Sequence, residues 1–348
     1  MLSVAGVMAK RRITSYDVAR AAGVSQTTVS FVLNEVEGAS ISDETRQRVL
    51  EVAEELGYVP DAAAQALGRG RTHIIGVVAT TMADPFIGTI VQTIESAAHE
   101  QGYTVILASS DDIPEREIEA VKMLQSRRVD GVIVTSSRVG ALYQERLEQL
   151  SIPVVLINSL AQHKGRYTLS IGVDNRRGGR MATDHLIQRG HRRIAYVAAP
   201  ADRGDDIERV AGYRDALREA DIDFDPSLVV QGTGLAGGGQ RALPALLSLD
   251  DAPSAAFCYN DMTAIGLMDA AREAGLSVPS DLAVVGFDDI AFAQFACPPL
   301  TTIAQPVGKL GRGAMEMVLT LLSDDPHSEL PVTKVTICGL LVVRASSG

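Results

Sequence analysis

The chain has 348 residues, of which 46% are hydrophobic, so it is long enough to bury one large core and we expect two. Its 43 Asp and Glu outnumber its 32 Lys and Arg, and the formal net charge of −11 argues against a protein that binds nucleic acid over its whole surface. No apolar run approaches the roughly 18 to 20 residues of a membrane span, which argues against an integral membrane protein.

The charge is unevenly distributed along the chain. Residues 1–34 carry four basic side chains and one acidic one (net +3), residues 35–71 carry four Arg and eight acids (net −4), and the remaining 277 residues carry −10. Residues 1–12 place apolar residues before basic ones, the reverse of a secretory signal. We therefore expect a cytoplasmic protein, with Met1 and Met8 as alternative starts. By charge, only its extreme N-terminus favours binding to a polyanion such as nucleic acid.

Two helices joined by a short turn are predicted next. The first covers 16–22 with Ser15 as its N-cap, Gly23 stands where a tight turn needs positive φ, and Ser25 caps a second helix that ends near Asn34. Small and apolar residues recur where the two helices must meet: Val18, Ala19, Ala22, Val24, Val29 and Val32. This arrangement is typical of a helix-turn-helix.

A third helix is predicted between its N-cap, Ser42, and Gly57, which ends it. Its apolar positions follow helical spacing: Val49, Val52, Ala53 and Leu56. It would complete a three-helix core. The alternative is an unrelated small helical bundle.

The exposed side chains of the second helix are uncharged but form hydrogen bonds: Gln26, Thr27, Thr28 and Ser30. A Gln side chain can pair with adenine through two hydrogen bonds, and Thr can contact a phosphate or a thymine methyl group. Hydroxyl groups and helix N-terminal amides can hold phosphates without a net positive charge. An acidic protein can therefore still bind DNA through this helix.

The segment that follows, 60–72, begins with Pro60 and seven strong helix formers. A helix this short lies below the roughly 12 to 15 residues at which an isolated helix becomes marginal, so we expect it to be helical only when packed. Leu67 near its end suits insertion into a minor-groove step, and Arg69 and Arg71 add positive charge.

Three segments resemble the headpiece and hinge of the lactose-repressor (LacI/GalR) family of bacterial transcription regulators: ITSYDVARAAGVSQTTVSFVLN, SDETRQRVLEVAEELGYVP and AAAQAL. The resemblance continues to about Arg344. It implies that Gln26 and Thr27 read bases, and that Ala64 and Leu67 enter the minor groove. The side chains it implies for the DNA backbone are Thr14, Ser25, Thr28, Ser30 and Asn34. Phe31 departs from the polar or basic residue that family members often carry there.

From residue 74 onward, apolar runs alternate with amphipathic stretches. Strands are predicted at 74–80, 104–110, 131–137, 153–158, 193–199, 227–232, 255–260 and 282–289, and helices at 87–101, 114–128, 176–189, 206–220, 261–274 and 308–323. Such alternation is typical of parallel sheets covered on both faces, and the length favours two doubly wound domains. The fold class is thus an α/β core of two parallel-sheet lobes behind an all-α headpiece. The resemblance implies lobes like those of a periplasmic sugar-binding protein, with a ligand cleft between them.

The predicted organisation has four parts: an N-terminal extension (1–12), the headpiece (13–59), a hinge helix and linker (60–72), and an effector-binding and dimerisation core (73–346). The core divides into a first lobe, about 73–172 and 303–323, and a second lobe, about 173–302 and 324–346.

Ligands of open α/β sheets bind beyond the carboxyl ends of the strands, so polar residues at those ends are candidates. The effector contacts implied by the resemblance are Phe86, Asp174, Arg203, Arg209, Asn260, Asp288 and Gln305. Carboxylates and an arginine can hydrogen-bond hydroxyl groups, and an aromatic ring can stack on a sugar. For any single acid, helix capping is an equally good explanation. We expect Asp261 and Asp289 to be caps.

A competing motif is the GxGxxG of Gly232–Gly237, which lies between a predicted strand and a helix, with Asp261 ending the next strand. This is the context of a dinucleotide site. Against that reading, the motif lies two-thirds along the chain and two further glycines follow it. Many relatives carry an aromatic residue near Gly234, and none is present here.

No set of catalytic residues competes: the His residues are scattered, and GxSxG and HExxH are absent. The three cysteines, Cys258, Cys297 and Cys338, have no metal-ligand spacing, and we expect free buried thiols. The sequence therefore predicts no enzyme, no cofactor and no metal.

The expected function is that of a sequence-specific DNA-binding transcriptional regulator, a repressor, that acts as a homodimer or tetramer on a near-palindromic operator. A sugar or related polyol bound between the lobes would control it. Two alternatives remain: a ligand-binding module without DNA function, and a nicotinamide-dependent oxidoreductase that uses Gly232–Gly237.

Overall fold

The structure, a computed structural model, describes residues 13–34, 38–59, 70–135, 152–159, 168–200, 203–323 and 334–348. The chain divides into two compact units, residues 1–72 and 73–348. In the described ranges, no helix is both long enough and apolar enough to cross a membrane.

The described residues of the first unit form three helices: α1 (Ser15–Ala22), α2 (Gln26–Leu33) and α3 (Asp43–Glu55). As predicted, Gly23 ends α1 in the left-handed conformation (φ 68°) and Ser25 caps α2. The predicted cap of α1, Ser15, is wrong because Thr14 takes that role. The Thr14 hydroxyl accepts from the Asp17 N–H (3.4 Å), and the Asp17 carboxylate accepts from the Thr14 N–H (3.0 Å), which satisfies two otherwise unpaired donors.

The buried residues of this unit come from all three helices: Val18, Ala19, Ala22, Val29, Val32, Val49 and Ala53. Ser42 caps α3, as predicted, and Leu56 is exposed rather than in the core. The Arg48 Nε donates to the Ala22 carbonyl (3.1 Å), which ties α3 to the end of α1. The helix-turn-helix therefore has a core of its own.

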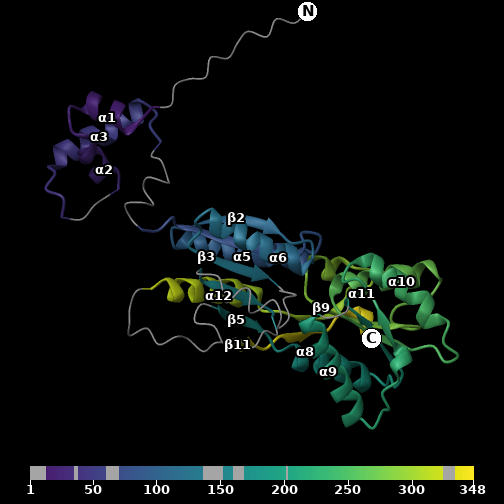
Figure 1. The fold of residues 1–348 in the computed structure, drawn as a ribbon. Helices are drawn as coiled ribbons and strands as arrows, with labels where there is room; N and C mark the ends of the chain where they lie inside the picture. The colour runs from purple at the N-terminus through teal and green to yellow at the C-terminus, as the bar shows by residue number, and fades with distance from the viewer. Residues whose placement is uncertain are drawn as a thin grey trace, which may run out of the picture. The chain divides into compact units, whose positions relative to one another are not determined.

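The second unit contains two six-stranded sheets (Figure 1). The first sheet is wholly parallel, in the order β11-β5-β4-β3-β1-β2. Its strands in chain order are β1 (Ile74–Ala79), β2 (Thr104–Ser109), β3 (Gly131–Thr135), β4 (Val154–Ile157), β5 (Thr168–Val173) and β11 (Lys334–Ile337).

The second sheet has the order β12-β10-β9-β8-β6-β7 and is parallel except for the β10–β12 pair. Its strands are β6 (Ile194–Ala198), β7 (Val229–Gln231), β8 (Ala255–Cys258), β9 (Ala283–Asp288), β10 (Thr301–Ala304) and β12 (Leu340–Val342). The predicted core of two parallel-sheet lobes is confirmed.

Helices cover both faces of each sheet. Among the described residues, those of the first lobe are α5 (Pro85–Glu100), α6 (Pro114–Ser126) and α12 (Val307–Leu322), and those of the second are α8 (Asn175–Gln188), α9 (Gly204–Glu219), α10 (Ala236–Leu247) and α11 (Asp261–Glu273). Neighbouring positions of β9 show the two faces of the second sheet, since Phe287 packs against Gly178 of α8 whereas Gly286 lies against Asp261 of α11.

Between the elements that the structure describes, the chain passes from one sheet to the other three times, from β5 to α8, from β10 to α12 and from β11 to β12. The predicted second lobe included 324–346, which the structure corrects: Lys334–Ile337 pairs with β5 of the first sheet. Only two residues separate β11 from β12, so a short crossing divides this segment between the lobes. The sequence predicted no strand at β5, β10, β11 or β12. The first three carry Ser or Thr residues that interrupt the apolar run by which the other strands were predicted, and β12 has only three residues.

All three cysteines are free thiols, but only Cys258, on β8, is buried. Cys297 and Cys338 are exposed, so the prediction of buried thiols is wrong for these two. Both lie in connecting segments, which run over the surface because water satisfies their backbone groups there.

Candidate functional site

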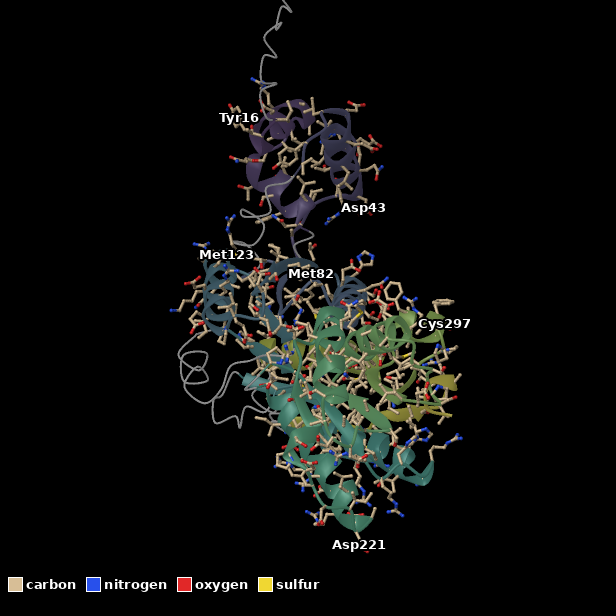
Figure 2. The ribbon with its side chains drawn as sticks, turned by 90° about the vertical axis from the view of Figure 1, so that its right-hand side faces the viewer. Tyr16, Asp43, Met82, Met123, Asp221 and Cys297 are labelled. Carbon is tan, nitrogen blue, oxygen red and sulfur yellow. The ribbon has the colours of Figure 1, made fainter. Side chains whose placement is uncertain are left out.

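Helix α2 presents an uncharged polar surface. Gln26, Thr27 and Ser30 are exposed, and α2 contains no charged residue. The Gln26 side-chain amide donates to the Ser15 hydroxyl (2.9 Å), which places it beside the start of α1. Phe31, 39% exposed, lies on the same helix, and Tyr16 of α1 projects from the surface (Figure 2). This surface offers hydrogen bonds and apolar contacts in place of positive charge.

Three of the predicted backbone-contacting hydroxyls, those of Thr14, Ser25 and Thr28, lie near helix N-termini, where unpaired N–H groups favour anions. The Ser25 and Thr28 side-chain oxygens are 2.8 Å apart at the start of α2, and the Thr14 hydroxyl donates to Asp17 (2.8 Å) at the start of α1. Asn34 donates to the Ser30 hydroxyl (3.1 Å) at the other end of α2. The positions at the starts of α1 and α2 suit phosphate groups, whereas the contacts proposed for Ser30 and Asn34 stay a prediction. Ala64 and Leu67 lie outside the described residues, and their role stays a prediction.

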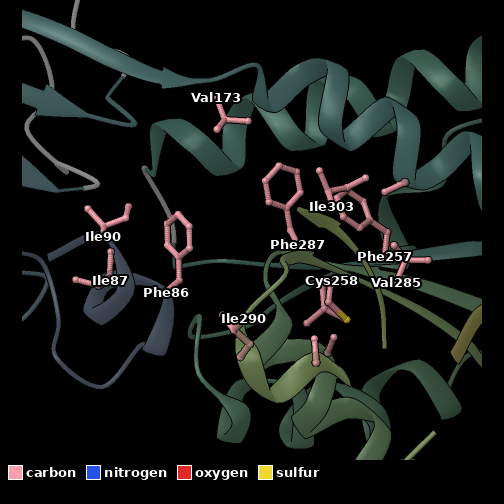
Figure 3. Close-up of a cluster of buried hydrophobic side chains, with 14 of the residues drawn as sticks. Phe86, Ile87, Ile90, Val173, Phe257, Cys258, Val285, Phe287, Ile290 and Ile303 are labelled. Carbon is pink, nitrogen blue, oxygen red and sulfur yellow. The ribbon is translucent and has the colours of Figure 1, made fainter. Parts of the chain in front are cut away.

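The second unit has a pocket of about 180 Å³ between its lobes, beyond the carboxyl ends of the strands. Four of the predicted effector residues line it: Phe86, Arg203, Arg209 and Asp288. Phe86 lies at the start of α5 and Phe287, next to Asp288, at the end of β9 (Figure 3). Both lobes thus contribute to one cavity, as expected at the ends of open sheets.

Arg209 is the central cation of this pocket, and only 2% of it is exposed. Its Nε donates to Asn175 (3.0 Å) and its Nη1 to the Tyr259 carbonyl (2.5 Å), while its guanidinium stacks 3.6 Å from the Phe287 ring centre. Burial alone would lower the pKa of Arg209, but Tyr259 and two nearby carboxylates outweigh burial and raise it. These carboxylates, Asp205 and Asp288, lie 4.0 and 3.9 Å from Nη2.

Two polar contacts join the lobes across the pocket. The Arg203 Nη1 of the second lobe binds Asp112 of the first at 2.9 Å, and Asn260 donates to Asp84 at 3.3 Å. Arg203 also reaches Asp205 (3.4 Å). Because Arg203 and Asp112 are both largely shielded from water, their attraction is weakly screened.

We expect the Arg203–Asp112 pair to contribute measurably to the stability of the core. A double-mutant cycle of Asp112→Asn and Arg203→Gln should give a coupling free energy of about 1 to 3 kcal/mol, as is found for contacting charged groups. The measurement is chemical unfolding of the ligand-free protein. The exposed Arg116–Asp111 pair (2.6 Å) is the control and should give a value near zero. Equal values for the two pairs would contradict a contact between the lobes.

Asp288 has an unusual backbone conformation and connects the pocket to the crossings between lobes. Its φ is 121°, a region that residues other than glycine rarely adopt and that often marks functional positions. Gln305 donates to Asp288 (2.6 Å), Asn158 donates to Gln305 (3.1 Å), and Asn158 accepts from the Val173 N–H (2.9 Å). Gln305 therefore lies behind Asp288 and does not line the cavity, and this chain of bonds ends at the β5–α8 crossing.

Asp174 and Asn260 both cap helices. Asp174 accepts from the Arg177 N–H (2.9 Å) at the start of α8 and does not line the cavity, so the structure does not bring it to the other candidates. Asn260 accepts from the Thr263 N–H (3.0 Å) at the start of α11, and its amide also donates to the Gly234 carbonyl (2.9 Å). Asn260 thus supports the wall of the pocket.

The expectation that Asp261 and Asp289 cap helices is wrong. Asp261 is fully buried and accepts from the Ile290 N–H (2.9 Å) and the Thr302 hydroxyl (2.5 Å). Asp289 forms an ion pair with Arg344 (2.7 Å). Asn260 precedes Asp261 and already caps α11, which leaves the Asp261 carboxylate free to bind the neighbouring strand and loop.

Several lining residues were not among the predicted contacts. Tyr259, whose hydroxyl donates to Asp205 (2.6 Å), directly follows β8, and Asp112 follows β2. Because both residues follow strands, the sequence alone could have identified them as candidate ligand contacts. The Tyr259 ring also lies beside Gly234, since a Cβ there would be 3.7 Å from it. An aromatic ring thus occupies this part of the pocket, although the sequence has none at Gly234 itself.

The glycine-rich segment Gly232–Gly237 is used mainly for packing. Gly234 has a φ of 74° and lines the pocket, and a Cβ at Gly232 would collide with the Ala198 carbonyl. Asp261, the acid that a dinucleotide site would direct at a ribose, is buried in the hydrogen bonds given above. These contacts oppose the dinucleotide interpretation.

Comparison with known protein families and proteins gives consistent matches. Residues 14–61 match the family of bacterial regulatory proteins called lacI, and residues 183–347 match the periplasmic binding protein-like domain. The chain is 35% identical over 318 residues to the HTH-type transcriptional repressor PurR of Vibrio atlanticus, which covers 91% of this chain and 94% of that protein. It is 37% identical over 301 residues to the HTH-type transcriptional regulator DegA of Bacillus subtilis, covering 86% and 88%.

Solved structures show the same fold. The lac repressor dimer bound to operator and the anti-inducer ONPF has a TM-score of 0.86 at 30% identity, over 97% of this chain and 99% of that one. A complex of the transcriptional regulator CelR with cellobiose has a TM-score of 0.72 at 32% identity, over 96% and 100%.

Proposed function

The chain belongs to the lacI family of bacterial regulatory proteins, and from this premise we propose that it is a sequence-specific transcriptional repressor whose operator affinity is set by a small ligand. The observation that carries the proposal is the presence of two separate parts in one chain. One is a helix-turn-helix with an uncharged, hydrogen-bonding outer helix, and the other is a core with a polar pocket lined by both lobes.

In this proposal, Gln26 and Thr27 read base edges, while hydroxyl groups near the starts of α1 and α2 hold phosphates. The hinge residues Ala64 and Leu67 would enter the minor groove, as the sequence resemblance implies. Two copies of the chain would bind the two halves of a near-palindromic operator, as the dimeric lac repressor is bound to its operator. The acidic core would then disfavour DNA contact through the wrong surface.

The effector would bind in the 180 Å³ pocket, with Phe86, Arg203, Arg209 and Asp288 in direct contact. Asn260 and Gln305 would position those groups, since each binds a lining carboxylate. Asp174 remains a proposed contact only for a ligand that extends beyond the cavity. A sugar or polyol is the default ligand, and sugars occupy solved relatives such as the cellobiose complex. The ligand would favour one relative position of the lobes and would thereby change operator affinity. Because such coupling is reciprocal, the operator would change ligand affinity by the same factor.

The site supports binding rather than catalysis, and the protein would act in the cytoplasm, where the DNA is. We further propose the four-part organisation of extension, headpiece, hinge and core, with 334–337 moved to the first lobe.

The decisive experiment is selection of bound sequences from a random DNA pool by the purified protein at near-physiological salt. Enrichment of a near-palindrome with two related half-sites is the expected result. Selection repeated with pooled metabolites tests whether a co-repressor is required. No enrichment under either condition would overturn the DNA-binding proposal.

A further inference from the structure

The pocket carries an excess of negative charge. Apart from Asp111, which is exposed and paired with Arg116, its carboxylates outnumber its guanidinium groups four to two, a formal balance of −2: Asp84, Asp112, Asp205 and Asp288 against Arg203 and Arg209. In an enclosed site such charge is poorly solvated and therefore costly unless it is compensated. The chemistry of the pocket thus sets the charge of its ligand.

The two arginines are already bound to protein groups. Arg203 binds Asp112 and Asp205, and Arg209 donates to Asn175 and the Tyr259 carbonyl. Both guanidinium groups also lie over the Tyr259 ring, at 5.5 and 4.6 Å. An anionic ligand would have to displace these partners while facing the remaining carboxylates. We therefore expect phosphorylated sugars and sugar acids to be excluded.

Asp84 and Asp288 line the pocket from opposite lobes, and both carboxyl groups are buried enough for their pKa values to rise. Burial raises the pKa of Asp84. Burial also raises the pKa of Asp288; Arg209 counteracts part of that increase and the negative charge of Asp84 adds to it. The bond from Gln305 and the approach of Arg209 both involve Oδ1 of Asp288, and within the described ranges no hydrogen bond reaches its Oδ2.

Thr80 lies beside the pocket at the end of β1 and is fully buried. Its hydroxyl finds no hydrogen-bond partner among the residues that the structure describes, which is costly. Because this hydroxyl is closed off from the empty cavity, a ligand could satisfy it only if the pocket opens toward it on binding.

We propose that the ligand of this pocket is a small polyol that carries a protonated amine, bound between Asp84 and Asp288 beside the ring of Phe86. The proposal rests on the proposed function, in which this pocket is the effector site. An ammonium group would form charge-assisted hydrogen bonds with both carboxylates and favourable contacts with the aromatic face. Because one carboxylate comes from each lobe, the amine would also hold the lobes together.

Two observations narrow the class of ligand. In the described part of the chain, no group of three His, Cys, Asp or Glu side chains is placed to hold a metal ion, which favours an organic cation. The pocket volume of about 180 Å³ lies below the roughly 300 to 1,000 Å³ of sites for drug-sized ligands. An amino sugar of one ring, or an amino polyol of similar size, fits both.

The test uses the full chain and thermal unfolding as the readout. The probes are D-glucosamine, D-glucose and D-glucuronate, together with the cationic, neutral and anionic fractions of a small-molecule ultrafiltrate of bacterial cells. The cationic fraction should raise the unfolding temperature, whereas the neutral and anionic fractions should not. Asp84→Asn and Asp288→Asn should each weaken that binding about tenfold or more, the loss typical of one charge-assisted hydrogen bond.

Asparagine keeps the helix cap at position 84 and tolerates positive φ at position 288, so both variants should fold. The matched control is Asp269→Asn, which removes an exposed carboxylate of α11 outside the pocket lining and should leave binding unchanged. Stabilisation by the neutral or anionic fraction alone would overturn the amine but keep the effector site. If no fraction stabilises the protein, the effector site itself is wrong. Undiminished binding to both variants would refute the placement between the two carboxylates.

Discussion

Replacement of Arg209 by alanine is expected to abolish ligand control while DNA binding survives. The change removes the cation next to Asp288 and one of the two cations next to Asp205, and it removes the bonds to Asn175 and Tyr259. Loss of one partner from a buried charged cluster typically costs about 3 to 5 kcal/mol. We expect a loss of that size in the free energy of unfolding of the core, together with loss of ligand binding.

The headpiece should be unaffected because it is a separate compact unit with its own core. Chemical unfolding, calorimetric titration of the ligand and operator binding would be measured on the same preparation. Arg209→Lys is the second variant: it keeps the charge but cannot reproduce the planar fork, so it should recover part of the stability without ligand binding. A normal ligand response in either variant would show that the pocket is assigned wrongly.

Substitution of Gln26 by alanine is expected to reduce operator affinity by about 30-fold to 10⁴-fold. One base contact of this kind is worth roughly 1 to 3 kcal/mol, and a dimer loses it at both half-sites. Thr27→Ala should have a smaller effect, because Thr27 can make only one hydroxyl or methyl contact with a base, whereas Gln26 can form two hydrogen bonds. The measurement is fluorescence anisotropy with the selected operator and with variants at each base position.

A matched control exists for this experiment. Gln47→Ala removes the same side chain from the exposed surface of α3, where its amide binds Glu51 (3.1 Å), and should leave operator affinity unchanged. If Gln26→Ala weakens binding to every sequence alike, the residue contacts phosphates and does not read bases.

The sequence predicted the regular parts of the molecule well because their signals are local. A cap, a left-handed glycine and periodic apolar positions are enough to place α2, Gly23 and the strands that form the centre of each sheet. Thr14 was missed as the cap of α1 because adjacent Thr and Ser residues give the same signal, and only the reciprocal bonds with Asp17 decide between them.

The pocket was harder to predict because its geometry depends on distant residues. Arg209 was identified, yet the contacts that fix it come from segments 34 and 50 residues away. Asp112 and Arg203 are 91 residues apart, and no spacing rule pairs them. Likewise, a strand-end acid can cap a helix, as Asp174 does, or face a cavity, as Asp288 does. Only the tertiary structure distinguishes the two.

The threefold crossing between lobes has a consequence for how the protein is made. Strand β11, at the edge of the first sheet, and β12, at the edge of the second, leave the ribosome within a few residues of each other. The segment after them is also fixed to the second lobe, where Ser346 donates to the Val284 carbonyl (2.6 Å) and binds the Thr301 N–H (2.8 Å). Neither lobe is complete until β11 and β12 have both been made, so the two mature together. The headpiece, whose contacts are local, can fold long before them.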